Sequence, residues 1–155
     1  MEDIQYLTFF IGKEVFAVEV LKIHEIIPYD TITHIPRMAP YLKGVMNIRG
    51  KIVPIVSLNK RLDLNIQMDN KKQSIIIISL PYEDEMNDVG IIVSKVDQVF
   101  TVDKKDIESS PIFGSKIKKE FIKNIVKFKD NFISILDIDE ILNLHELSTT
   151  TQKMV

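Results

Sequence analysis

Two stretches of this chain occur twice, and the repetition limits the folds available to it. The segment YLKGVMNIRGKIVPIVSLNKRL (41–62) resembles FIKNIVKFKDNFISILDIDEIL (121–142) at an offset of 121 − 41 = 80 residues. Upstream, KIHEII (22–27) resembles KVDQVF (95–100) at an offset of 95 − 22 = 73 residues. The order of the matches is preserved, and a longer loop in the second copy explains the larger offset. We therefore expect one module used twice.

Short β-strand patterns dominate both copies. Turn residues at Gly12-Lys13, Gly50-Lys51 and Asp130-Asn131 separate apolar runs that are rich in β-branched residues. Helical patterns are few and short, and we expect them at 38–42, 58–62, 116–122 and 138–146, the last capped by Asp137 or Asp139. Short strands joined by hairpins, twice over, predict a mainly β fold of two small barrels packed together.

The repeat also predicts how the chain divides. We expect residues 1–62 to form the first β-barrel subdomain and residues 74–147 to form the second. Residues 63–73, DLNIQMDNKKQ, are polar enough to be the linker between them. The tail 148–155 has no apolar periodicity, and we expect it to be flexible.

Strand alternation predicts which way the hairpin at 45–58 presents its side chains. Met46 and Ile48 share the inner face, whereas Val45, Asn47 and Arg49 share the outer face. The return strand is apolar on both faces, and its Pro54 is expected on an edge or at a bulge. An apolar outer face needs a cover, either the neighbouring barrel or a partner protein. An arginine in apolar company is typical of such an interaction surface, although a plain turn residue is the alternative.

Composition excludes several classes of protein. The 155 residues are 45% hydrophobic, which is enough for a buried core, and the net charge of −2 gives no drive toward nucleic acid. The absence of cysteine removes disulfides, thiolate nucleophiles and cysteine-ligated metals. The acidic N-terminus MEDIQYLTFF is unlike a secretory signal, and no apolar run approaches the roughly 20 residues of a membrane span. We expect a cytoplasmic protein that does not insert into a membrane.

The residues that carry chemistry in enzymes do not gather into a motif here. His24, His34 and His145 lie far apart and in no metal-ligand spacing. The acidic residues at 137–140 are expected to cap a helix, and the basic residues at 116–119 to be solvated. We therefore expect no catalytic site, no metal and no cofactor.

The segment from Tyr6 to Leu62 is similar to the first half of the CheW family of bacterial chemotaxis coupling proteins, and 74–142 is similar to the second half. The most specific part is KGVMNIRGKIVPIVSL (43–58), which resembles the family's Asn-Leu-Arg-Gly and Pro-Val-x-Asp-Leu signature. The resemblance implies two five-stranded SH3-like β-barrels. It also implies a cytoplasmic adaptor between the helical tips of chemoreceptors and the regulatory domain of the histidine kinase CheA, recruited to membrane-associated receptor arrays.

The resemblance carries over to individual residues only where the motifs match. Arg49 matches the family's arginine associated with receptor binding, and the stretch that contains Ile23 and Glu25 matches another set of partner contacts. The residues expected to bind partners or to frame that site are Ile23, Glu25, Gly44, Val45, Asn47, Arg49 and Gly50. Ser57 replaces the usual aspartate of the signature, which puts in doubt any hydrogen bond which that aspartate makes.

Three other functions remain open from the sequence. A paralogous coupler of a non-motility pathway would have the same sequence features. An SH3-like nucleic-acid binder would share the small barrels, but the net charge disfavours it. An enzyme would require a concave pocket that gathers His24, His34 or the acidic residues at 137–140.

Overall fold

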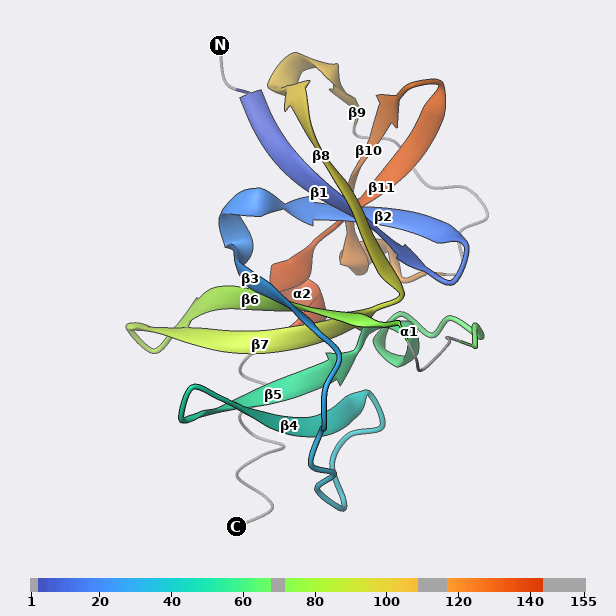
Figure 1. The fold of residues 1–155 in the computed structure, drawn as a ribbon. Helices are drawn as coiled ribbons and strands as arrows, with labels where there is room; N and C mark the ends of the chain where they lie inside the picture. The colour runs from blue at the N-terminus through green and yellow to red at the C-terminus, as the bar shows by residue number, and fades with distance from the viewer. Residues whose placement is uncertain (1–2, 68–71, 109–116, 144–155) are drawn as a thin grey trace.

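The computed structural model describes residues 3–67, 72–108 and 117–143 (Figure 1). The strands are β1 (Asp3–Ile11), β2 (Glu14–Glu19), β3 (Ile23–Pro28), β4 (Leu42–Ile48), β5 (Lys51–Ser57), β6 (Ser74–Tyr82), β7 (Glu85–Val93), β8 (Lys95–Asp103), β9 (Ile107–Glu108), β10 (Ile122–Phe128) and β11 (Asn131–Leu136). The helices are α1 (Leu58–Arg61) and α2 (Ile138–Ile141), with 3-10 turns at Val20–Lys22, Lys104–Asp106 and Lys119–Phe121. None of the helices in these ranges is long and apolar enough to cross a membrane.

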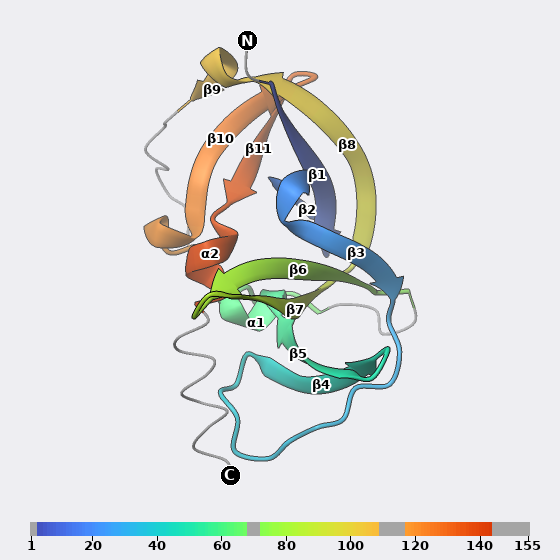
Figure 2. The ribbon, with the colours of Figure 1, turned by 90° about the vertical axis from the view of Figure 1, so that its left-hand side faces the viewer.

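The strands form two stacked sheets that repeat one arrangement (Figures 1 and 2). One sheet has the order β8-β1-β2-β11-β10-β9 and the other has the order β3-β6-β7-β5-β4. Replacing each strand of the second sheet by its counterpart in the other copy gives the order β8-β1-β2-β11-β10, and the short β9 is an additional edge strand of the first sheet. The mainly β class with two sheets is therefore confirmed. The sheets are curved but open, so they are not the closed barrels that were predicted.

The two copies exchange their first hairpins. Strands β1 and β2 pair with β8 and β11 of the other copy, and β6 and β7 pair with β3 and β5. The 3-10 turn at 20–22 carries the chain from one sheet to the other. The predicted division into 1–62 and 74–147 therefore does not follow the sheets, because residues 3–19 belong with 95–136.

The exchanged hairpins are buried on both faces, which explains their unbroken apolar runs. In β6, Ile75 and Ile77 belong to a hydrophobic cluster formed within their own curved sheet. Ile76 and Ile78 belong to a central cluster between the two sheets. This central cluster also takes Leu58 of α1 and residues of α2, and Figure 2 shows both helices at one side of the boundary. Each sheet thus has a hydrophobic cluster of its own, and a third cluster shared by both sheets holds them together.

Equivalent positions of the repeat make equivalent contacts at the two helices. Ser57 and Asp137 are 80 residues apart and cap α1 and α2. The Ser57 side chain accepts a hydrogen bond from the backbone N–H of Lys60, and the Asp137 side chain accepts one from the backbone N–H of Glu140. The backbone N–H groups of Ser57 and Asp137 donate to the carbonyls of Tyr41 and Phe121, which are also 80 residues apart, at 2.7 and 2.8 Å. The prediction that Asp137 caps the last helix is confirmed. Ser57 takes the same capping role.

Several local predictions differ from the structure. The turns lie at Arg49-Gly50 and Lys129-Asp130, one residue earlier than predicted, because Ile48 pairs with Lys51 and Phe128 pairs with Asn131. Gly12-Lys13 is confirmed as a turn, since Ile11 pairs with Glu14. Residues 38–42 contain an isolated turn instead of a helix. In the described part of the predicted helix 116–122, residues 117–122, the chain forms the short 3-10 turn Lys119–Phe121 and then enters β10. The predicted helix at 138–146 ends at Ile141 as α2; residues 144–146, His145 and the tail 148–155 lie outside the described residues.

Candidate functional site

Arg49 lies at the tip of the β4–β5 hairpin, in the first of two turn positions. The backbone φ angles are 51° at Arg49 and 85° at Gly50, as in the type I′ turns that match the twist of a two-residue hairpin. The side-chain oxygen Oδ1 of Asn47 accepts a hydrogen bond from the backbone N–H of Gly50 at 2.9 Å. Asn47 and Gly50 therefore frame the turn that holds Arg49 away from the sheet.

The guanidinium of Arg49 forms a two-pronged ion pair with Glu25 on β3. Its Nη1 donates to Oε2 of Glu25 at 3.1 Å, and its Nη2 donates to Oε1. Such parallel hydrogen bonds fix the plane as well as the position of the guanidinium. The hydrogen bond from Arg49 lowers the pKa of Glu25 below its ordinary value, and Glu25 in turn raises the pKa of Arg49. Two predicted site residues thus form one unit.

This unit remains open to solvent and has charged neighbours. The side chain of Arg49 is 66% exposed and that of Glu25 is 25% exposed. Next to Glu25 on the same strand, Nδ1 of His24 lies 3.0 Å from Oδ2 of Asp88 on β7. The Asp88 carboxylate also acts electrostatically on Arg49. The guanidinium is therefore paired with Glu25, acted on by the nearby charge of Asp88, and exposed to a partner.

Gly44 has a role in the frame that no other residue can fill. A side-chain Cβ at this position would lie 2.2 Å from the carbonyl oxygen of Thr33, closer than atoms can approach. Thr33 and Val45 exchange two backbone hydrogen bonds of 2.9 Å, which tie the segment after β3 to β4. Because β3 and β4 are the two edges of their sheet, this bridge and the Arg49–Glu25 pair both link its edges. The glycine allows the segment after β3 to approach β4 closely enough for this bridge.

The outer face of the hairpin is apolar, as predicted. Val45 pairs with Pro54, and Asn47 pairs with Ile52, so these four side chains share one face. Ile52 is 65% exposed, whereas Met46 on the opposite face is buried. Pairing of β5 with β7 begins at Ile55, directly after Pro54, so the missing N–H of the proline costs no hydrogen bond to β7. An exposed apolar face with an arginine at its tip is suited to protein contact.

Ile23, the remaining predicted site residue, has a different place. Its side chain is half-buried and packs against the central cluster. It lies two residues from Glu25 across an irregularity in the pairing of β3 with β6. The structure therefore brings Arg49, Glu25, Asn47, Gly44, Gly50 and Val45 together at one hairpin and the neighbouring strand, whereas Ile23 packs against the central cluster.

The ion pair itself was not predicted from the sequence. At the equivalent positions of the second copy, the chain has Lys129 at the turn and Gln98 in place of Glu25, since 25 + 73 = 98. Lys129 keeps the positive charge of Arg49, whereas Gln98 lacks the carboxylate of Glu25, so the second copy has no equivalent ion pair at these positions.

The chain and its fold are similar to those of known proteins. The CheW-like domain family matches residues 5–146 of the chain. The chemotaxis protein CheW of Bacillus subtilis is 35% identical over 132 residues, which cover 85% of this chain and 81% of that protein. The CheW of Treponema pallidum is 27% identical over 94% of this chain and 86% of its own length. The crystal structure of the scaffolding protein TtCheW from Thermoanaerobacter tengcongensis superposes with a TM-score of 0.78 at 28% identity, covering 88% of this chain and 90% of that one.

Proposed function

The chain belongs to the CheW-like domain family, and on that premise we propose that it is a chemotaxis adaptor that joins two partners. One partner is the helical cytoplasmic tip of a chemoreceptor, and the other is the regulatory domain of the histidine kinase CheA. The protein acts by geometry and carries out no reaction. Its place in the cell is the cytoplasmic side of membrane-associated receptor arrays.

The observation that supports this proposal most is the exposed Arg49–Glu25 pair beside the apolar face of the β4–β5 hairpin. A receptor helix that packs on Ile52 and Pro54 places a polar residue near the hairpin tip. An arginine at the rim of such a contact supplies charge-assisted hydrogen bonds that orient the helix.

Glu25 has a second role in this proposal, as an internal competitor. A carboxylate of the receptor that binds Arg49 must share or displace the Glu25 carboxylate. Removing the charge of Glu25 therefore frees the guanidinium for the partner. Removing Arg49 leaves Glu25 as an unpaired acid that repels the same group.

The test compares the binding of a receptor-tip fragment to the wild-type chain and to three variants by isothermal titration. Arg49→Ala should weaken binding at least about tenfold, as expected for an interface arginine. Lys129→Ala is the matched control, because Lys129 occupies the equivalent turn position with nearly the same φ angle, 49° against 51°. It should bind like the wild type. Glu25→Gln should strengthen binding up to about fivefold.

Two results would remove the proposal. Equal affinities of Arg49→Ala and Lys129→Ala would place the receptor contact elsewhere. A loss of folding in Arg49→Ala, seen by circular dichroism, with Lys129→Ala intact, would make Arg49 a structural residue that links β4 to β3.

A further inference from the structure

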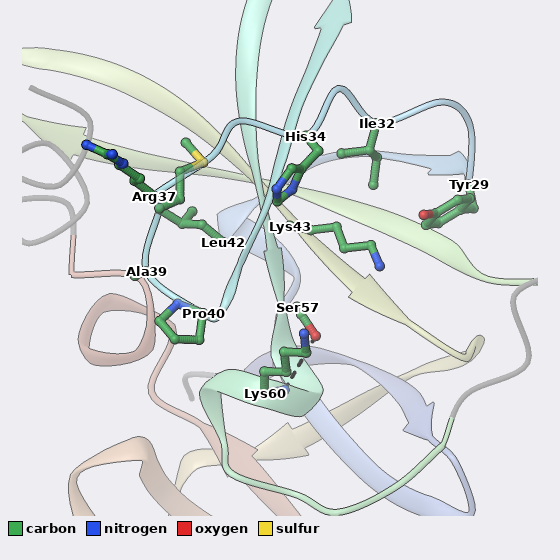
Figure 3. A pocket seen from close by; sticks show the side chains of 11 residues that line it. Tyr29, Ile32, His34, Arg37, Ala39, Pro40, Leu42, Lys43, Ser57 and Lys60 are labelled. Atoms are coloured by element: carbon green, nitrogen blue, oxygen red, sulfur yellow. Dashed lines mark hydrogen bonds between the residues drawn. The ribbon is translucent and has the colours of Figure 1, made fainter. Parts of the chain in front are cut away.

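A second concave surface lies away from the Arg49 site. A groove of about 460 Å³ opens between the 29–43 segment, the start of β4 and α1 (Figure 3). Ile32, Met38 and Leu42 give it an apolar lining, and Arg37, Lys43 and Lys60 add three cations. No carboxylate lines it. The groove is therefore apolar and positively charged in a chain whose net charge is −2.

The three cations are available to a ligand. None of Arg37, Lys43 and Lys60 makes an ion pair within the described part of the chain. By contrast, Lys22 and Lys123 on other parts of the surface pair with Asp139 and Glu19. Cations gathered without acids create a local positive potential that attracts carboxylates.

The groove is largely formed before any ligand arrives. The backbone N–H of Tyr29 donates to the carbonyl of Gln73 at 3.0 Å, and the Thr33–Val45 bridge fixes the middle of the segment. The N–H of Leu42 closes a turn on the carbonyl of Ala39 at 2.9 Å. A segment anchored at three points loses little freedom when a ligand binds, which favours affinity.

The position of the groove separates it from the receptor contact. It lies at the Leu42 end of the β4–β5 hairpin, whereas Arg49 lies at the other end. The seven residues of β4 span roughly 20 Å at the rise of a β-strand. A ligand in the groove can therefore bind while the hairpin tip is occupied.

We propose that this groove binds an extended acidic peptide segment of a partner protein. Aliphatic side chains of the segment occupy the lining of Ile32, Met38 and Leu42, and its carboxylates pair with Lys43 and Lys60. A volume of this size holds a few side chains, as in other preformed ligand sites. Three cations around an apolar floor differ from the long basic stripe with several stacking aromatics that single-stranded nucleic acid requires.

The experiment measures fluorescence anisotropy with a labelled, end-blocked peptide of alternating glutamate and leucine. The double variant Lys43→Gln/Lys60→Gln should bind it about tenfold more weakly than the wild type, since each exposed pair contributes up to about fivefold. The matched control is Lys13→Gln/Lys127→Gln, which removes two exposed lysines elsewhere and should bind within about twofold of the wild type. A peptide with glutamine in place of glutamate should not bind measurably.

Other outcomes would overturn the proposal. If the wild type showed no saturable binding of the peptide, the groove would not be a peptide site. Equal binding of the peptide by the two double variants would also show that the groove is not the site. A single-stranded oligonucleotide that binds more tightly than the peptide, with the same dependence on Lys43 and Lys60, would assign the groove to nucleic acid. Arg49→Ala should leave peptide binding unchanged, so the failure of the receptor contact and the failure of this site are distinguishable.

Discussion

Arg61 joins the two copies of the repeat, and replacing it tests how much that junction stabilises the fold. Its Nε donates to the backbone carbonyl of Ile141 at 2.7 Å, and its guanidinium carbon lies 4.4 Å from the ring centre of Tyr41 and 5.1 Å from that of Phe121. Tyr41 and Phe121 are equivalent in the repeat, and so are Arg61 and Ile141 (61 + 80 = 141). Equivalent residues meet in this way only near an approximate two-fold axis.

The magnitude follows from these contacts. A hydrogen bond from a charged donor contributes about 1.5–3 kcal/mol, and each cation–π contact contributes about 0.5–1 kcal/mol. Arg61→Met keeps part of the apolar volume and loses all three interactions, so we expect a loss of about 2–4 kcal/mol in the free energy of unfolding. At about 2–4 °C per kcal/mol for a chain of this size, the melting temperature should fall by roughly 5–15 °C.

The assay is urea unfolding followed by circular dichroism, with Lys13→Met as the control for loss of an exposed cation. Arg61→Lys should fall between Arg61→Met and the wild type, because a lysine keeps the charge but not the planar, stacked group. An Arg61→Met variant within about 0.5 kcal/mol of the wild type would refute the junction.

Three further predictions concern single positions. Gly44→Ala should lower the free energy of unfolding by about 2–4 kcal/mol in urea titrations, because the new Cβ forces Thr33 away and breaks its two hydrogen bonds; an unchanged midpoint would contradict this. Asp137→Ala should cost about 1 kcal/mol through loss of the α2 cap, measured in the same way, and Asp137→Asn should restore it. The pKa of Glu25, followed by NMR titration, should rise toward its ordinary value of 4.5 in Arg49→Ala. Because the pKa of Glu25 is lowered in the folded chain, the stabilisation from the ion pair is fully present above the pKa of the unfolded state and is lost as the pH falls through the pKa of the folded state. Equal pKa values of Glu25 in the wild type and in Arg49→Ala would show that the ion pair does not form in solution.

The repeat was the part of the fold that the sequence predicted best. The offset of 80 residues pairs Ser57 with Asp137, and the structure gives both the same capping hydrogen bond. Strand alternation also placed Met46 inside and Asn47 outside correctly. These are local patterns, and burial on one face determines them directly.

The exchange of hairpins could not be predicted from the same patterns. Strands β1 and β6 have equivalent sequences that are apolar on both faces, so either would fill either sheet. The path of the chain at 20–22 and at Ser94, between β7 and β8, decides which sheet each hairpin joins. We predicted boundaries at 62 and 74 because neighbours in sequence are usually neighbours in space. The hairpins β1–β2 and β6–β7 depart from this rule, because each joins the sheet of the other copy.

The site was predicted in part. Arg49, Asn47 and Gly50 lie in one turn, which a short motif can specify. The partner of Arg49 lies 24 residues away on another strand, and pairing over that distance depends on how the edges of the sheet meet. The groove at 29–43 gave no pattern at all, because its cations come from a loop, a strand and a helix that only the fold brings together.

The proposed adaptor function requires this chain to hold two partners at once. Sedimentation velocity of the chain mixed with a CheA regulatory domain and a soluble receptor-tip fragment measures that directly. We expect one boundary that contains all three components, and Arg49→Ala should release the receptor fragment from it while the kinase domain stays bound. Two separate binary complexes that never combine, with each partner excluding the other, would contradict the adaptor function.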